Sequence, residues 1–416
     1  MNRVIQTVSS PEEIASTARQ LRETTLNKPL APGAVLDLLE RWAGELGGRD
    51  LDDLPGLPFL RLWFRRGTLE PILSRELGAE ALEGGWRSEG RARLKVFPRG
   101  TIGHWPAGNI EIQPLLSMSC ALLGGNSSLV RVPAGLVEVT CRLLDKLEIV
   151  DSSGILTERI ALALFDHSND EAHQAMARNV DGAMIWGGAE AVLRVRALPF
   201  PHWAHLTVFG PRLSVAAMDG TIWRDHSERP SWCRRIARDV WQFDQQACSS
   251  PQALFLEGES SSDVCDFIAE LKRAFEEENQ AHPRREIQAA QTGAICLARA
   301  TWLLDDDKRQ AWFPGPPDWT ILLGEGTVVP NPVQGRTLHV LLAKDLEEVI
   351  SEFDGTVQTL GLAIGKPERE KVLAQNAGSR GVDRIVKLGR MHNFGSPWDG
   401  VDIIRPMVRV VRHVPS

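Results

Sequence analysis

Short apolar runs alternate with helical segments from about residue 93 onward, and this alternation constrains the fold more than any other feature of the sequence. RLKVFPRG, GGNSSLVRVP and DGAMIWGG read as strands, and helical patterns span about 111–123 and 135–147. Strands that alternate with helices are typical of βαβ units and a parallel sheet. We therefore predict an α/β fold whose ligands gather at the carboxyl ends of the strands, where we place Gly125, Gly187 and Gly188.

The chain before residue 93 has a different pattern, because amphipathic segments there alternate with helix breakers. Ser10 precedes Pro11 and two acidic residues, which predicts a helix start. Later in the chain, SWCRRIARDVWQFDQQA predicts a helix and PQALFLEG a strand, followed by a helix over 261–278 and a strand–helix–strand unit over 337–365. A chain of 416 residues at this hydrophobicity divides into two or three lobes.

Composition narrows the class of protein. Hydrophobic residues make up 43% and charged residues 24%, as in a soluble globular protein, and a net charge of −7 argues against a nucleic-acid binder. No apolar run is long enough for a membrane span, and the N-terminus lacks the apolar region of a signal peptide. Six scattered cysteines indicate reduced thiols, so we expect a cytoplasmic protein.

Several common site motifs are missing. The sequence contains no GxGxxG, and Gly365-Lys366 is followed by Pro367 without the upstream glycine of a phosphate loop. No GxSxG elbow is present, and His202 and His205 have no third ligand in a metal-binding spacing. The sequence therefore predicts neither a P-loop enzyme nor a metal site.

FDQQACSSPQ is the segment whose residues most clearly indicate a reactive side chain. Cys248 lies between a helical pattern and a strand, with small or polar neighbours that leave its sulfur accessible. A thiolate at such a junction is a candidate nucleophile. The alternative from the residues alone is a small buried thiol without a chemical role.

Four segments in one order resemble the LuxC family of acyl-CoA reductases, within the aldehyde dehydrogenase superfamily. They are RGTIGHWPAGNIEIQPLLSMSCALLGGNSSLVRVP, IWGGAEAV, FDQQACSSPQ and GVDRIVKLGR with SPWDG, and the resemblance covers about residues 93–412. It implies an aldehyde-dehydrogenase-like α/β fold, with a Rossmann-type cofactor domain, an α/β catalytic domain and assembly as a homodimer or tetramer. The implied divisions are a helical N-terminal layer at 1–92, a dinucleotide-binding domain at 93–246, a catalytic domain at 247–386 and a C-terminal segment at 387–416.

The resemblance also implies a reaction. Cys248 stands at the position of the nucleophile, which takes the acyl group from acyl-CoA or an acyl-carrier protein, and a nicotinamide hydride then reduces the acyl-cysteine to an aldehyde. The oxyanion is held by the backbone N–H of Cys248 and by an amide for which Asn109 is the best match. Read structurally, Asn109 is a turn former that follows Gly108.

Cofactor residues are implied in the same way. Arg131 matches a basic residue that contacts the adenosine ribose, and Ala134 stands where NAD-preferring relatives carry a glutamate, so we favour NADPH over NADH. Trp186-Gly187-Gly188-Ala189 resembles the turn that opens a helix beneath the pyrophosphate. The structural alternatives are a surface charge at Arg131 and a plain strand-to-helix turn at Gly187-Gly188.

Two departures from the superfamily pattern bear on the reaction. HLTVFGPR, residues 205–212, has no acidic residue where hydrolytic relatives carry their general base, and NPVQGRT, residues 331–337, lacks a glutamate for the nicotinamide ribose. The first departure argues against an aldehyde-oxidising enzyme that makes a free acid. A non-catalytic acyl-binding or scaffold protein is a further alternative, and Trp398-Asp399-Gly400 is interpreted as a structural turn.

Overall fold

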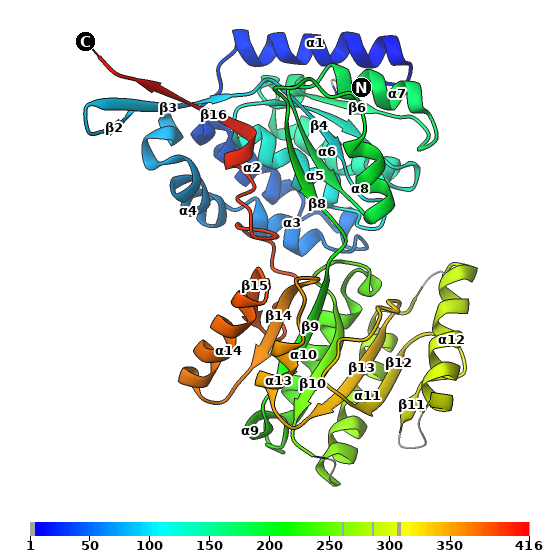
Figure 1. The fold of residues 1–416 in the computed structure, drawn as a ribbon. Helices are drawn as coiled ribbons and strands as arrows, with labels where there is room; N and C mark the ends of the chain where they lie inside the picture. The colour runs from blue at the N-terminus through cyan, green and yellow to red at the C-terminus, as the bar shows by residue number, and fades with distance from the viewer. Residues whose placement is uncertain (1–4, 260–261, 285–286, 306–308, 416) are drawn as a thin grey trace. The chain divides into compact units, whose positions relative to one another are not determined.

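The computed structural model describes residues 5–259, 262–284, 287–305 and 309–415, which form two compact units (Figure 1). The first unit comprises Met1–Pro211 with Phe394–Ser416, and the second comprises Arg212–Asn393. The boundary predicted at 246/247 therefore falls inside the second unit, and the predicted C-terminal segment 387–416 is divided at 393/394.

The first unit is built on a six-stranded sheet of order β1-β6-β5-β4-β7-β8, in which every neighbouring pair is parallel. This confirms the predicted α/β fold with a parallel sheet. Its strands are β1 (Gln6–Val8), β4 (Thr101–Trp105), β5 (Ser127–Arg131), β6 (Ile160–Ala163), β7 (Gly182–Trp186) and β8 (His205–Phe209). Its crossover helices are α5 (Gln113–Leu123), α6 (Val137–Val150), α7 (Asp170–Arg178) and α8 (Ala189–Arg196).

The helix predicted at Ser10 is α1 (Pro11–Asn27), and a reciprocal pair of hydrogen bonds begins it. Ser10 Oγ accepts from the Glu13 N–H at 3.2 Å, and Glu13 Oε2 accepts from the Ser10 N–H at 3.1 Å. The helices α2 (Pro32–Glu45), α3 (Leu57–Trp63) and α4 (Arg66–Leu77) follow. The stretch 1–92 also contributes β1, which extends the sheet beside β6.

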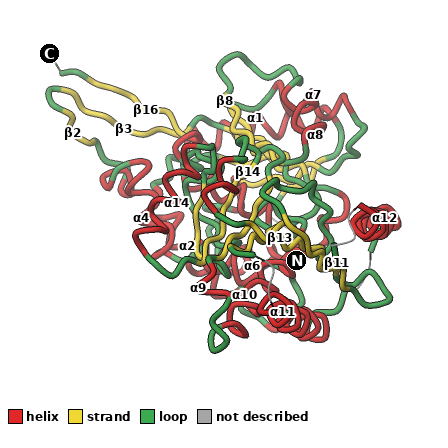
Figure 2. The backbone as a smooth tube through the Cα atoms, turned by 60° about the horizontal axis from the view of Figure 1, so that its bottom comes forward, coloured by secondary structure: helices red, strands yellow, loops and turns green. Residues whose placement is uncertain are grey.

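The strand predicted in RLKVFPRG forms, but outside the parallel sheet. β3 (Ala92–Pro98) pairs antiparallel with β2 (Arg87–Glu89) and with β16 (Val408–His413), and Figures 1 and 2 show β3 and β16 side by side. Its assignment to a βαβ unit was wrong because β3 runs through a short turn, not a helix, into β4, and is only partly buried beyond Ala92.

The second unit has a seven-stranded sheet of order β11-β12-β13-β10-β9-β14-β15, parallel except for the edge strand β11. On the central strand, Leu254 and Leu256 face one apolar core, and Ala253 and Phe255 face the other. The strands are β9 (Leu213–Met218), β10 (Pro251–Glu257), β11 (Gln310–Trp312), β12 (Thr320–Glu325), β13 (Thr337–Ala343), β14 (Val357–Ala363) and β15 (Arg384–Lys387).

The helices of this unit are α9 (Gly220–Trp223), α10 (Arg229–Trp241), α11 (Ser262–Ala281), α12 (Ala289–Asp305), α13 (Leu346–Ser351) and α14 (Pro367–Ser379). Short 3₁₀ turns across both units are η1 (Arg49–Leu51), η2 (Ala79–Glu83), η3 (Ala134–Leu136), η4 (Thr157–Arg159), η5 (Gln242–Gln245) and η6 (Arg405–Met407). No helix in the described part of the chain is both long and apolar enough to cross a membrane.

Trp398-Asp399-Gly400 has a structural explanation within the first unit. Trp398 and Val401 exchange two backbone hydrogen bonds of 2.9 and 3.0 Å, and Asp399 and Gly400 both have positive φ angles, 47° and 72°. This is the tight hairpin turn that Asp-Gly favours. Trp398 is buried, with its ring 4.7 Å from that of Phe394.

Glu76 of α4 anchors the segment that follows this turn. Its buried carboxylate accepts backbone hydrogen bonds from Ile404 at 2.8 Å and Arg405 at 2.7 Å. Because a buried and a partly buried N–H group both depend on one carboxylate, Glu76 ties the C-terminal segment to the helices.

We expect Glu76→Ala to lower the free energy of unfolding by about 2 kcal/mol, since it leaves the buried Ile404 N–H and the partly buried Arg405 N–H without their acceptor. Urea unfolding followed by far-ultraviolet circular dichroism measures the change. Glu80→Ala, at an exposed position nearby, is the control and should change the free energy by less than about 0.5 kcal/mol. Equal effects in the two variants would contradict the anchoring role.

Candidate active site

Cys248 is half-buried in the loop between η5 and β10, at the amino end of the central strand of the second sheet. The loop is fixed at the backbone of Cys248, because Ser214 Oγ of β9 donates a 2.6 Å hydrogen bond to the Cys248 carbonyl. The next residue, Ser249, is buried and its hydroxyl lies 3.0 Å from His392 Nδ1.

Three consecutive residues before Cys248 adopt left-handed backbone angles. Phe243, Asp244 and Gln245 have φ values of 55°, 52° and 60°, which cost non-glycine residues about 1–2 kcal/mol each. Such a conformation persists only where the surrounding contacts impose it.

The start of β13 supplies those contacts. Gln245 Oε1 accepts from the Thr337 N–H at 2.6 Å, and its Nε2 donates to the carbonyls of Thr337 and Pro251 at 2.8 Å each. Asp244 accepts a 2.6 Å hydrogen bond from Arg336 Nε and a 3.2 Å hydrogen bond from Arg284 Nε. The side chain of Gln245 therefore acts as a short piece of strand between β10 and β13.

The segment 331–337, where the sequence lacks a glutamate, is part of the same arrangement. Gln334, Gly335 and Arg336 form a second left-handed run with φ values of 63°, 59° and 59°. The pairing of Arg336 with Asp244 joins the two left-handed runs. This segment thus supports the loop that carries Cys248, a role that its sequence did not predict.

The candidate cofactor residues and the candidate oxyanion residue Asn109 lie at one edge of the first sheet. Arg131 ends β5, Asn109 follows β4, and Gly187 follows β7, and these three strands are neighbours in the order β5-β4-β7. The connections from β4 lead to β5 on one side, whereas β7 lies on the other side, so this edge is a topological switch point. Ala134 lies exposed at the start of η3, three residues beyond Arg131.

Gly125 does not belong to this edge, so its placement at a carboxyl strand end was wrong. It precedes β5 and ends α5 with a φ of 78°, while the Asn126 N–H bonds back to the Ala121 carbonyl at 3.0 Å. Glycine is preferred at such a helix stop. The Asn126 side chain is fully buried and binds the backbone of Arg99, Gly100, Ala121 and Met407, so this residue of the quoted GN pair is structural.

Arg131 has a buried donor atom that could bind a polar ligand. Its Nε is buried and makes no hydrogen bond within the described residues, and its guanidinium carbon lies 6.0 Å from the centre of the Phe165 ring. Burial lowers the pKa of Arg131, Asp166 opposes this shift, and the charge of Arg194 adds to it. An anion placed here would meet the Arg131 guanidinium, whereas Arg194 is already paired with Asp170 at 2.6 Å.

Trp186 differs from the residues that follow it. Its ring is buried and stacks on Phe209 at 3.8 Å, and its Nε1 donates to Ser117 Oγ at 3.0 Å. Ser117 also lies 2.8 Å from Nδ1 of His104, where burial lowers the pKa to about 3 and keeps the ring neutral. Trp186 therefore fixes the end of β7.

Gly188 and Ala189 are exposed, in contrast to Trp186. Gly188 caps α8 without a side-chain hydrogen bond to the first turn of the helix. The space around its Cα is open, since an added Cβ would meet nothing within 4 Å. The first N–H groups of α8 are thus left for an external acceptor. Asn109 lies in an exposed turn beyond β4 in this same unit, whereas Cys248 belongs to the second unit.

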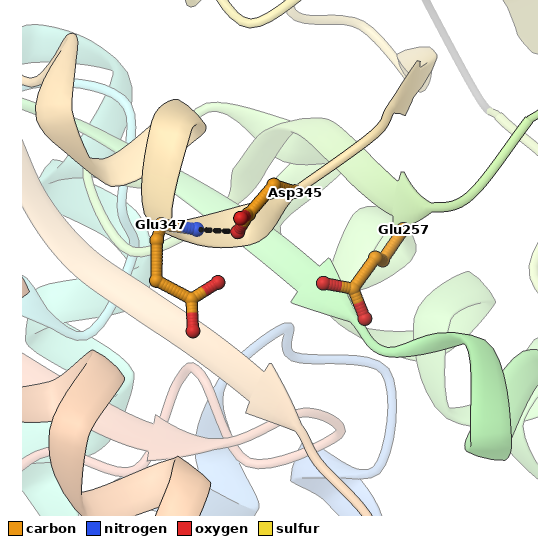
Figure 3. A group of neighbouring side chains, drawn as sticks. All are labelled: Glu257, Asp345 and Glu347. Carbon is orange, nitrogen blue, oxygen red and sulfur yellow. Dashed lines mark hydrogen bonds between the residues drawn. The ribbon is translucent and has the colours of Figure 1, made fainter.

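An acidic cluster at the opposite end of the second sheet has an internal counter-charge. The carboxylates of Glu257, Asp345 and Glu347 lie within 4.8 Å of one another (Figure 3). Arg369 donates to Glu257 Oε2 at 2.6 Å and to Glu347 Oε2 at 2.8 Å. Burial alone would raise the pKa of Glu347, but the hydrogen bonds and the positive charge of Arg369 lower it to about 2. The cluster is therefore an ion-pair network around Arg369.

Solved structures with the same fold define the class of protein. An aldehyde dehydrogenase from Brucella melitensis biovar abortus 2308 has a TM-score of 0.74 at 13% identity, covering 97% of this chain and 89% of that one. An NADP-dependent glyceraldehyde-3-phosphate dehydrogenase from Bacillus halodurans has a TM-score of 0.70 at 14% identity, covering 98% and 91%. A bifunctional proline utilization A protein matches at 0.70 and 16% identity, and this chain spans 45% of its length. The fold is that of an aldehyde dehydrogenase.

Within this class the chain belongs to the acyl-CoA reductase (LuxC) family, whose sequence pattern matches residues 44–410. The long-chain acyl-protein thioester reductase of Vibrio harveyi is 24% identical over 356 residues, which cover 84% of this chain and 71% of that protein. Long-chain acyl-protein thioester reductase 2 of Photobacterium leiognathi is 23% identical over 350 residues, covering 84% and 70%. The predicted family and fold are confirmed, and the chain is an oxidoreductase of the acyl-reductase class.

We expect Gln245→Leu to lower the free energy of unfolding by about 3 kcal/mol, because three buried backbone groups lose their partner. The left-handed turn before Cys248 should relax as well, which limited proteolysis of the native protein would report. Gln375→Leu, at an exposed position on α14, is the matched control. Unchanged stability in Gln245→Leu would contradict the role given to this amide.

Proposed function

We propose that the chain reduces an acyl thioester to an aldehyde with NADPH, through an acyl-cysteine on Cys248. The observation that carries the proposal is the hydrogen-bonded loop that holds Cys248 half-buried before β10, in a chain of the acyl-CoA reductase (LuxC) family. The family description refers to acyl-CoA, and the names of the relatives refer to long-chain acyl groups on proteins. Both are thioesters, so the same sulfur serves either donor.

In the first half-reaction, the Cys248 thiolate attacks the thioester carbonyl carbon and expels the CoA or carrier thiolate, which leaves the acyl group on Cys248. The carbonyl oxygen becomes negative during the attack, and the backbone N–H of Cys248 and the amide of Asn109 are the proposed donors to it. Because this step exchanges one thioester for another, it needs no reductant and can be observed without the cofactor.

In the second half-reaction, the acyl carbon of acyl-Cys248 would accept a hydride and become the alkoxide form of a thiohemiacetal. Bound NADPH supplies that hydride. Collapse of the thiohemiacetal releases the aldehyde and regenerates the Cys248 thiolate. The segment 205–212 contains no acidic residue to activate water, which supports transfer to hydride over hydrolysis to a free acid.

The residues at the carboxyl edge of the first sheet fit a dinucleotide. The Arg131 Nε, which has no hydrogen bond within the described residues, suits a ribose phosphate, and Ala134 leaves room where a carboxylate would repel it. The uncapped first turn of α8 after Gly188 suits the pyrophosphate. We propose that the first unit binds the cofactor and the second carries the nucleophile. Assembly as a dimer or tetramer stays a prediction.

Cys248→Ala should abolish aldehyde formation from acyl-CoA and NADPH, by about 1,000-fold or more, because it removes the attacking atom. Intact-protein mass spectrometry after incubation with acyl-CoA alone should show one acyl adduct, mapped to Cys248. Cys265→Ala and Cys296→Ala remove exposed thiols and serve as controls that keep full activity. Unchanged turnover in Cys248→Ala, or free acid as the main product, would contradict the proposal.

Ala134→Glu should raise the KM for NADPH by about tenfold or more and leave the KM for NADH nearly unchanged, because a carboxylate repels the 2′-phosphate. Arg131→Ala should weaken NADPH binding in the same direction, which quenching of tryptophan fluorescence would measure. Arg178→Ala, at an exposed position on α7, is the charge-matched control. An equal effect of Ala134→Glu on both cofactors would contradict the assignment of NADPH.

A further inference from the structure

A buried hydrogen-bond chain leads from the residue after the nucleophile to helix α10. Ser249 Oγ lies 3.0 Å from His392 Nδ1, and His392 Nε2 lies 2.7 Å from the backbone oxygen of Asp239. Ser249 and His392 are separated by 143 residues in sequence, yet both belong to the second unit and both are buried. None of the reaction steps above uses His392.

The geometry fixes the direction of each hydrogen bond. A backbone carbonyl oxygen can only accept, so Nε2 of His392 carries the proton. Burial lowers the pKa of His392 to about 4, the bond to Asp239 opposes this shift, and Arg384 adds to it, so the ring is neutral near pH 7. A neutral ring protonated at Nε2 has a lone pair at Nδ1. The Ser249 hydroxyl is therefore the donor.

His392 is itself held on several sides. The Asp239 carboxyl group accepts backbone hydrogen bonds from Gly389 at 2.6 Å and Met391 at 3.4 Å. Arg384 of β15 donates to the carbonyls of Met391 and Asn393 at 3.3 and 3.0 Å. The backbone on both sides of His392 is thus bonded, and the ring itself is held by its bonds to Ser249 and to the Asp239 carbonyl.

The ring of His392 also contacts the other side of the Cys248 loop. Phe243, the first of the left-handed residues, meets it edge to face, with ring centres 5.6 Å apart. The His392 imidazole therefore contacts both the loop before Cys248, through Phe243, and the residue after it, Ser249. On the same peptide, Ser214 holds the Cys248 carbonyl.

We propose that His392 is a positioning residue for the reaction, which aims the Cys248 sulfur by holding the Ser249 hydroxyl, and this inference rests on the proposed role of Cys248. The Cys248–Ser249 peptide is bonded at the Cys248 carbonyl and at the Ser249 side chain. Loss of the second bond leaves this peptide held at the Cys248 carbonyl alone. The backbone at Cys248 then has more freedom, so its sulfur and its N–H are aimed less narrowly. This looser alignment slows the chemical step and leaves substrate binding largely intact.

The test compares His392→Leu, His392→Asn and Ser249→Ala in the full-length chain. We expect His392→Leu and Ser249→Ala each to lower kcat, and the rate of Cys248 alkylation by iodoacetamide, by about 10- to 100-fold. The KM for acyl-CoA should stay within about twofold, since the lost interaction acts on the chemical step. The Asn side-chain oxygen lies near the position of Nδ1 and accepts from Ser249, so His392→Asn should recover most of the rate.

The double variant His392→Leu/Ser249→Ala should be no slower than either single variant, because both remove the same hydrogen bond. His339→Leu is the control, since His339 is another buried neutral histidine of this unit whose ring faces Trp302 and the Gln252 carbonyl. Urea unfolding midpoints identify variants that fail to fold, and Ser249→Ala, which loses one oxygen atom, keeps the test usable if His392→Leu does not fold.

Normal kcat and alkylation in Ser249→Ala would overturn the proposal. Equal slowing by His339→Leu would also overturn it, because the effect would then reflect general loosening of the unit. Alkylation mapped to Cys248 by peptide mass spectrometry needs neither thioester nor NADPH. Failure of the proposed function would instead appear as full turnover in Cys248→Ala, whatever the alkylation rates are.

Discussion

The hydrogen bonds between Gln245 and the first residue of β13 are the interactions on which the arrangement around Cys248 depends. They offset the cost of three successive left-handed residues, and they end α10 and start β10 at a defined place. Without them, the loop would have easier backbone conformations available. The position of the sulfur is thus set by a side-chain amide that lies three residues before it.

Local sequence patterns predicted those elements well whose structure is determined by residues close together in the sequence. The capping residues around Ser10, the apolar run of β7 and the strand–helix–strand unit at 337–365 all formed, because each depends on neighbours in sequence. Partners distant in sequence were beyond such reasoning. β1 joins β6 about 150 residues later, and β3 pairs with β16 near the end of the chain. The predicted role of RLKVFPRG failed for the same reason, whereas Gly125 was misplaced because it is a local helix stop before β5.

The candidate site divides in a similar way. The motif around Cys248 and the Gly-Gly turn after β7 were visible in the sequence, since each is a short contiguous segment. The support of the loop was not, because Asp244 meets Arg336 across 92 residues and Ser249 meets His392 across 143. Gln245 stood inside the quoted motif, but only the fold shows that its amide completes the sheet.

The location of Cys248 at the amino end of β10 has an electrostatic consequence. In a parallel sheet the crossover helices start at the carboxyl edge, so their positive ends point away from this sulfur, and α10 ends just before the loop. Negative charge on sulfur here gains little from helix dipoles and depends on nearby backbone amides. Those amides are aimed only while the loop keeps its shape. Gentle heating or mild denaturant should therefore lower the reactivity of the Cys248 thiol well before either sheet unfolds.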